Sequence, residues 1–233
     1  MQELAALLRS ETQTIHQQVE SGVFMTTLLK GQLERSAYVL FLRNLVPIYD
    51  ELEQGLERHA DAPGISPILI RPLFRSPALH RDLELLHGAS WRNDLLPVTA
   101  CLEYVSHLRS LQNTAPARLA AHAYVRYLGD LSGGQMLGKI VARGLKLVDS
   151  FPDIVGSGVD FYHFGQADEV VGLAQRFRTG LDEIGKTGTR ELLDEAVTAF
   201  ELHIRLFHEL AARCGLLPAE NSYAPIKCPG TLG

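Results

Sequence analysis

The stretch Leu128-Gly129-Asp130-Leu131-Ser132-Gly133-Gly134-Gln135-Met136-Leu137-Gly138 places four glycines inside a segment with an otherwise helical pattern. Each glycine costs a helix up to ~1 kcal/mol relative to alanine, so about 4 kcal/mol of helix stability is forgone here. Three explanations compete: a loop between two helices, a tight helix–helix contact, or a helix whose backbone approaches a flat ligand. Because the apolar pattern continues through 119–128 and 136–147, we favour a close approach of the backbone to a partner.

A phosphate-binding loop is the main false match in this stretch. Gly133-x4-Gly138-Lys139 fits the start of that motif. The motif needs Ser or Thr next, to hold magnesium, and it follows a strand. Ile140 follows here and no strand precedes the glycines, so we do not expect a nucleotide site.

Outward from the glycines, apolar residues recur at helical spacing along nearly the whole chain. Leu4, Leu8, Ile15 and Val19 predict a first helix. A second helix has a stronger stripe and a kink expected at Pro47, and its apolar residues are Tyr38, Phe41, Leu42, Leu45, Tyr49, Leu52 and Leu56. Further helices are predicted after Pro97 and over 117–147, 167–184 and 189–214.

Nothing reads as a run of alternating strands, so the predicted fold class is all-α. We expect irregular links around 61–77 and 149–165. Residues 1–216 are predicted to form one helical domain. Residues 217–233, which are rich in proline and other turn-forming residues, are predicted to form a disordered tail.

Composition narrows the classes of function. The 233 residues are 46% hydrophobic and 21% charged, which is typical of a folded globular protein. The formal charge of -5 argues against nucleic-acid binding, which needs a broad positive field. No stretch approaches the length of a membrane helix. Three widely spaced cysteines and no secretory signal predict a cytoplasmic protein.

Nine histidines include one strong candidate ligand. His16 has Glu20 one helical turn later, and such a carboxylate can fix the imidazole tautomer of a metal ligand. A surface pair is the alternative. Glu84-x-x-His87 is half of a di-iron motif without a second copy. His203 and His208 do not share a helix face well, and Cys228-Pro229 is a lone dipeptide in the tail.

Taken together, these residues closely resemble the haem oxygenase family, in its soluble, bacterial-type form. The signature runs from Tyr124 to Gln135, with LGDLSGGQ as its specific core. Further matches follow in family order from about residue 4 to 214, and they are Glu11-Thr12-x-x-Ile15-His16-x-x-x-Glu20, Phe24-Met25, Lys30-Gly31-Gln32, Ile48-Tyr49, Thr198-Ala199-Phe200 and Leu206-Phe207.

The resemblance implies a helical domain that clamps haem between the His16 helix and the glycine-bearing helix. Haem would be substrate and cofactor, and dioxygen the co-substrate. A ferredoxin or a flavin reductase would donate electrons. The expected products are biliverdin, from opening at the alpha meso carbon, carbon monoxide and ferrous iron. No nucleic acid or membrane partner is expected.

The resemblance also assigns roles to residues. His16 would bind the iron with Glu20 beside it, and Gly129, Gly133 and Gly134 would face the ring together with Phe200. Asp130 would hold a proton-donating water, within a network completed by Arg126, Tyr49 and Tyr104. The propionates would be bound by Arg9, Tyr124 and Arg178.

Two positions depart from the family pattern. Ala174 stands where a lysine is common, and Arg176 is a possible substitute for it. His203 stands where asparagine is common. Two other classes of function remain open: a haem carrier or sensor, which would not need Asp130 and its glycines, and an unrelated enzyme on a similar helical scaffold, which would lack His16 and the LGDLSGGQ run.

Overall fold

The computed structural model describes residues 3–147, 156–186 and 189–217, and within them all regular structure is helical, which confirms the all-α prediction. The α-helices are α1 (Leu4–Glu11), α2 (Gln13–Ser21), α3 (Val23–Leu29), α4 (Arg35–Arg58), α5 (Ser76–His87), α6 (Trp91–Asp94), α7 (Thr99–Thr114), α8 (Leu119–Ala123), α9 (Gly129–Gly144), α10 (Ala167–Ile184) and α11 (Arg190–Arg213). Short 3-10 turns lie at Ser66–Ile68, Arg71–Leu73, Pro116–Arg118 and Asp160–Tyr162. A π-helical turn over Tyr124–Leu128 joins α8 to α9.

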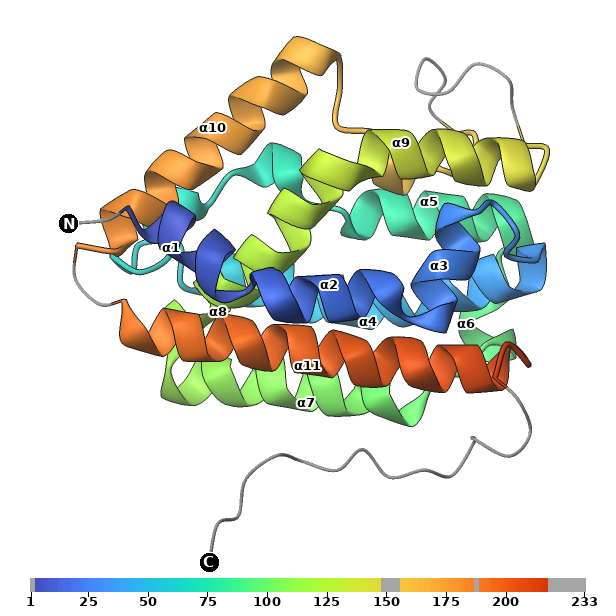
Figure 1. The fold of residues 1–233 in the computed structure, drawn as a ribbon, viewed down its shortest axis with the longest axis horizontal. Helices are drawn as coiled ribbons and strands as arrows, with labels where there is room; N and C mark the ends of the chain where they lie inside the picture. The colour runs from blue at the N-terminus through green and yellow to red at the C-terminus, as the bar shows by residue number, and fades with distance from the viewer. Residues whose placement is uncertain (1–2, 148–155, 187–188, 218–233) are drawn as a thin grey trace, which may run out of the picture.

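Helices that are far apart in the sequence pack side by side. In Figure 1, α11 runs across the lower part of the molecule, with α2 and α3 above it and α7 below it, and α11 also packs against α8. α4 packs against α5 and α7, and α1 packs against α10. The N-terminal helices therefore lie next to the last two helices of the chain.

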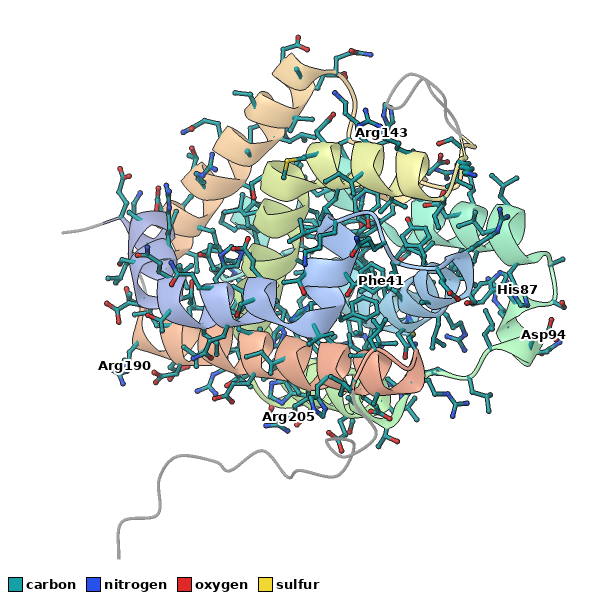
Figure 2. The ribbon with its side chains drawn as sticks, turned by 45° about the vertical axis from the view of Figure 1, so that its right-hand side comes forward. Phe41, His87, Asp94, Arg143, Arg190 and Arg205 are labelled. Atoms are coloured by element: carbon teal, nitrogen blue, oxygen red, sulfur yellow. The ribbon has the colours of Figure 1, made fainter. Side chains whose placement is uncertain are left out.

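The apolar stripes predicted from the sequence form the core. Leu42, Leu45, Leu52 and Leu56 of α4 have no exposed surface. Phe41 lies in the interior in Figure 2, whereas the labelled charged side chains lie at the periphery. α4 runs through Pro47 as one helix.

The predicted helix ends agree closely with the structure in α10 and α11, and less well at the N-terminus. The predicted first helix is two helices, because Thr12 leaves helical geometry between α1 and α2. The predicted link over 61–77 contains two 3-10 turns, and α5 begins at Ser76. Residues 148–155 of the second link, and residues 218–233 of the tail with Cys228-Pro229, lie outside the described residues. Among the described helices, none has the length and apolar character needed to cross a membrane.

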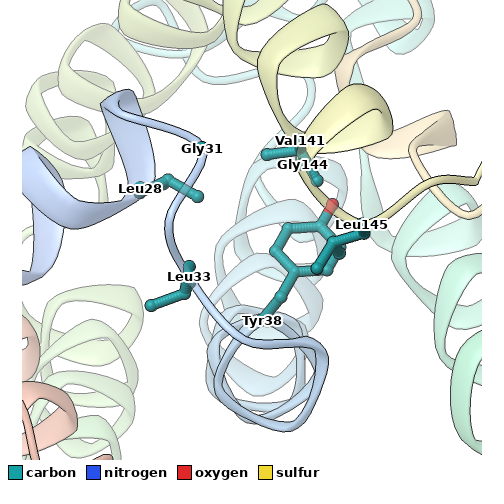
Figure 3. Close-up of a pocket in the computed structure, with 7 residues that line it drawn as sticks. All are labelled: Leu28, Gly31, Leu33, Tyr38, Val141, Gly144 and Leu145. Carbon is teal, nitrogen blue, oxygen red and sulfur yellow. The ribbon is translucent and has the colours of Figure 1, made fainter.

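The end of α9 rests on the loop between α3 and α4. Gly31, with φ +66°, and Gly144 meet there beside Tyr38 (Figure 3). A Cβ atom on Gly144 would lie 2.6 Å from the carbonyl oxygen of Gly31, which is backbone and cannot move cheaply. We expect Gly144→Ala to lower the free energy of unfolding by about 2 kcal/mol. Urea unfolding would measure this, and unchanged stability would contradict the close contact.

Buried Glu53 of α4 accepts hydrogen bonds from the backbone N–H groups of Arg75 (2.5 Å) and Ser76 (3.2 Å). Burial nevertheless raises the pKa of Glu53 from 4.5 to about 7. The folded state therefore binds more protons than the unfolded state between these values, and this group makes stability fall as pH rises through that window. The loss amounts to about 3 kcal/mol.

We expect Glu53→Gln to remove this part of the pH dependence. Urea unfolding of both proteins at pH 5 and pH 8 would measure it. The stability of the variant relative to the parent chain should increase by about 3 kcal/mol between the two pH values. An equal pH dependence in the two proteins would refute the raised pKa.

Candidate functional site

A cavity of about 600 Å³ lies between the N-terminal helices and the π-helical turn with the start of α9. Its walls come from α1, α2, the π turn, α9, α10 and α11. The predicted cofactor-binding residues that line it are Arg9, His16, Glu20, Tyr124, Gly129, Arg178 and Phe200. A volume of this size accommodates a large flat organic ligand.

His16 projects from α2 into this cavity and keeps 49% of its side chain exposed. The ring of Phe200 on α11 meets the imidazole edge to face, with 5.6 Å between ring centroids. Glu20 Oε1 lies 3.6 Å from His16 Nε2, beyond hydrogen-bond distance. The predicted His16–Glu20 pair is therefore present, but the carboxylate does not fix the imidazole tautomer in this structure.

Glycine makes the opposite wall bare. A Cβ atom on Gly129 would meet nothing within 4 Å, so the backbone of α9 is open to a ligand at this point. Gly133 also faces open space but does not line the cavity, and Gly134 packs against the ring of Tyr162 instead. Of the three glycines predicted to face the ligand, the structure places Gly129 at the cavity, Gly133 at open space and Gly134 against Tyr162. Gly133 lies one turn beyond Gly129, and Gly134 lies a further 100° around the helix.

The rim of the cavity carries positive charge and hydroxyl groups. Arg9 of α1 and Arg178 of α10 both line it, and α1 is held to α10 where Asp182 accepts a 2.8 Å hydrogen bond from the N–H of Ala5. Tyr124 places its hydroxyl 3.3 Å from Thr12 Oγ1. These groups suit the carboxylates of an anionic ligand.

One of the two departures from the expected pattern concerns position 174 and its possible substitute, Arg176. Ala174 is buried, so no cation stands at that position. Arg176, suggested as its substitute, is exposed and is not among the residues that line the cavity. The rim cations are Arg9 and Arg178.

Asp130 belongs to a buried hydrogen-bonded cluster next to Gly129. It accepts a short hydrogen bond from the Tyr49 hydroxyl and a 3.2 Å bond from Arg126 Nη2. Arg126 Nε also donates to the Tyr49 hydroxyl at 2.8 Å, and Arg126 Nη1 lies 2.9 Å from His203 Nε2. The structure therefore brings Asp130, Arg126 and Tyr49 together in one hydrogen-bonded network.

Burial shifts the pKa values of two ionisable groups in this cluster in opposite directions. Burial raises the pKa of Asp130, and the charge of Arg126 opposes that rise. Burial lowers the pKa of His203 well below its ordinary value, and Arg126 lowers it further. His203 is therefore neutral, its Nδ1–H donates to the Ala199 carbonyl at 2.7 Å, and its Nε2 accepts from Arg126. His203, which stands where the resemblance predicts asparagine, therefore accepts a hydrogen bond from the guanidinium of Arg126.

Tyr104 takes a different position from the one predicted. Its hydroxyl lies 3.0 Å from His122 Nδ1, and no hydrogen bond joins it to Asp130, Arg126 or Tyr49 among the described contacts. Only its ring reaches the cluster, through an edge contact with His203 at 5.0 Å between centroids. His203 lies beside Arg126, with its Nε2 2.9 Å from Arg126 Nη1.

Thr12 was not predicted as a site residue, yet it lines the cavity and contacts Tyr124. The sequence spacing could have indicated this position, since Thr12 lies one helical turn before His16 and therefore on the same helix face. Ser132 also lines the cavity and was overlooked between the glycines. Its hydroxyl donates to the Leu128 carbonyl at 2.6 Å, so it stays against the helix.

Comparisons with known proteins agree with this site. The family model described as "Heme oxygenase" matches residues 2–209. "Heme oxygenase 1" of Homo sapiens is 35% identical, over 98% of this chain and 78% of its own length. The Nostoc "Heme oxygenase 1" is 36% identical, over 89% of this chain and 85% of its own.

Solved structures are similar over the same range. The crystal structure of heme oxygenase-1 from Synechocystis in complex with heme has a TM-score of 0.84 and 32% identity, covering 92% of this chain and 95% of that one. Heme oxygenase from Leptospira interrogans has a TM-score of 0.82 and 36% identity, covering 89% of this chain and 100% of that one.

Proposed function

This chain belongs to the haem oxygenase family, and from that membership we propose that the cavity between α2 and α9 binds haem with His16 as the iron ligand. The chain is a haem-degrading enzyme that cleaves its substrate to biliverdin. Bound haem supplies the iron centre at which dioxygen is reduced and the meso carbon that is oxidised. The cavity that puts His16 opposite the bare backbone of Gly129 supports this proposal most directly.

The chemistry of the lining fits haem. A flat ring of this size needs a wall without side chains, and Gly129 supplies one. Imidazole is a good ligand for iron, and Phe200 limits where the His16 ring can turn. Arg9, Arg178 and Tyr124 are cationic or hydroxyl donors at one rim, where they would bind the propionates.

Asp130 would supply protons rather than contact the iron. Its carboxylate is fixed by Tyr49 and Arg126 directly behind the cavity wall at Gly129. A water held by this carboxylate would deliver a proton to the reacting oxygen. Arg126 and Tyr49 would act as positioning residues, since both bond to Asp130 and neither lines the cavity.

Several finer points are part of the same proposal. Anchoring of the propionates at the single rim of Arg9 and Arg178 fixes how the ring is rotated, and we propose cleavage at the alpha meso carbon. A ferredoxin or flavin reductase would provide electrons.

We place the enzyme in the cytoplasm because Cys101 and Cys214 are free thiols. We assign the activity to a single domain over residues 1–216.

Haem titration and single-turnover assays test the function. We expect the purified chain to bind haem with a histidine-ligated Soret spectrum. Addition of a reductase and oxygen should then convert it to a bilin, whose isomer chromatography identifies. A haem complex that is reduced and takes up oxygen but never loses its Soret band would exclude the enzymatic function and leave a carrier or sensor.

A further inference from the structure

Two histidines and a glutamate meet outside the haem cavity. His107 lies on α7, His122 on α8 and Glu195 on α11, three helices that pack against one another (Figure 1). The Nε2 atoms of His107 and His122 lie 2.6 Å and 3.0 Å from the same carboxylate oxygen, Glu195 Oε1. Ligand atoms of the three residues lie within 4.8 Å of one another.

Two imidazoles and a carboxylate around one point are a ligand set for zinc and related metals. Tetrahedral zinc, with bonds of about 2.0–2.1 Å, separates its ligand atoms by about 3.3 Å. When a cation replaces the hydrogen-bond protons, the distance from Glu195 Oε1 to His107 Nε2 would therefore increase by only about 0.7 Å. The distance to His122 Nε2 would increase by about 0.3 Å. We propose that His107, His122 and Glu195 form a binding site for a divalent first-row cation, zinc in particular.

The surroundings of the cluster match those of a metal site. The Tyr104 hydroxyl lies 3.0 Å from His122 Nδ1. With a cation on Nε2, the ring proton sits on Nδ1 and donates to the Tyr104 oxygen, which fixes the imidazole orientation. The side chains of His122 and Glu195 are 0% and 4% exposed, so a bound cation would be largely shielded from water.

A route from solvent is present. His107 keeps 31% of its side chain exposed and forms the outer ligand. Arg118 Nη1 lies 3.7 Å from the second oxygen of Glu195, with 37% of its side chain exposed. The guanidinium of Arg118 contacts Glu195 Oε2, so Glu195 Oε1 remains free to bind the cation. The positive charge of Arg118 nevertheless repels a bound cation. Removal of that charge should therefore strengthen cation binding.

Titration of the metal-free full-length chain with Co²⁺ tests the site, because tetrahedral Co²⁺ absorbs strongly in the visible and Zn²⁺ displaces it. We expect one Co²⁺ per chain. His107→Ala should weaken binding by at least about tenfold, since even outer-sphere partners of metal ligands contribute that much. Glu195→Gln should do the same, and Arg118→Gln should tighten binding.

The matched control is His208→Ala, which removes another half-buried histidine of α11 and should leave the Co²⁺ spectrum unchanged. Zn²⁺ should also raise the melting temperature of the parent chain and of His208→Ala, but not of His107→Ala. An octahedral spectrum, or equal affinity in the parent and His107→Ala, would overturn the proposal and leave a hydrogen-bonded trio. Because haem is absent, the result is independent of the haem function.

Discussion

Replacement of His16 by alanine is expected to lower the rate of haem turnover about 100-fold or more, which corresponds to about 2.7 kcal/mol of activation barrier. His16 is the only histidine among the residues that line the cavity, so no second imidazole replaces it. Haem affinity should fall much less, because burial of the ring supplies much of the binding energy. Single-turnover bilin formation and haem titration measure the two effects separately.

Two comparisons make the His16 result specific. Added imidazole should restore part of the activity, because Ala leaves space where the ring was. Gln17→Ala, which removes a neighbouring side chain from the same cavity wall, should keep turnover near that of the parent chain. Full turnover by His16→Ala without imidazole would remove His16 from the role of iron ligand.

Asp130→Ala is the second large effect, with bilin yield expected to fall at least about 100-fold, the lower end of the range for a lost proton donor. Haem affinity should stay within about twofold, since Asp130 does not line the cavity. The substitution removes the carboxylate that Tyr49 and Arg126 hold beside Gly129. Product chromatography after turnover with a reductase measures the yield.

The chain contains a matched control for this substitution. Asp194 pairs with Arg190 at the same four-residue spacing as Asp130 with Arg126, but on the exposed surface. Asp194→Ala should therefore leave yield unchanged, which separates loss of an ion pair from loss of the proton supply. A normal bilin yield from Asp130→Ala would refute the assigned role.

Much of the fold could be predicted because its signals are local. Apolar spacing predicts α10 and α11 nearly to the residue, and α10 begins with a capping box between Gln166 and Glu169. The break at Thr12 could not be predicted, because the apolar stripe continues across it. At that break the Thr12 hydroxyl donates to the Leu8 carbonyl at 2.7 Å and lies 3.3 Å from the Tyr124 hydroxyl, which comes from a distant part of the chain.

The position of a site residue is easier to predict where one helix face decides it, as for His16, which lines the cavity. It is harder to predict where several helices meet. Tyr104 was placed with Asp130, but its hydroxyl direction depends on His122 and on the bulk of His203. Gly134 was placed at the ligand, although its face is occupied by Tyr162 from beyond α9. A single sequence does not show which of several neighbouring side chains a residue contacts.

The π-helical turn over 124–128 has a further consequence for how the site tolerates change. It adds one residue to the helical path between α8 and α9. Without that residue, everything after the turn would rotate by about 100° relative to everything before it. A single-residue deletion here would leave each chemical group in the chain yet turn Gly129 away from His16. The length of this segment, as well as its composition, is therefore under constraint.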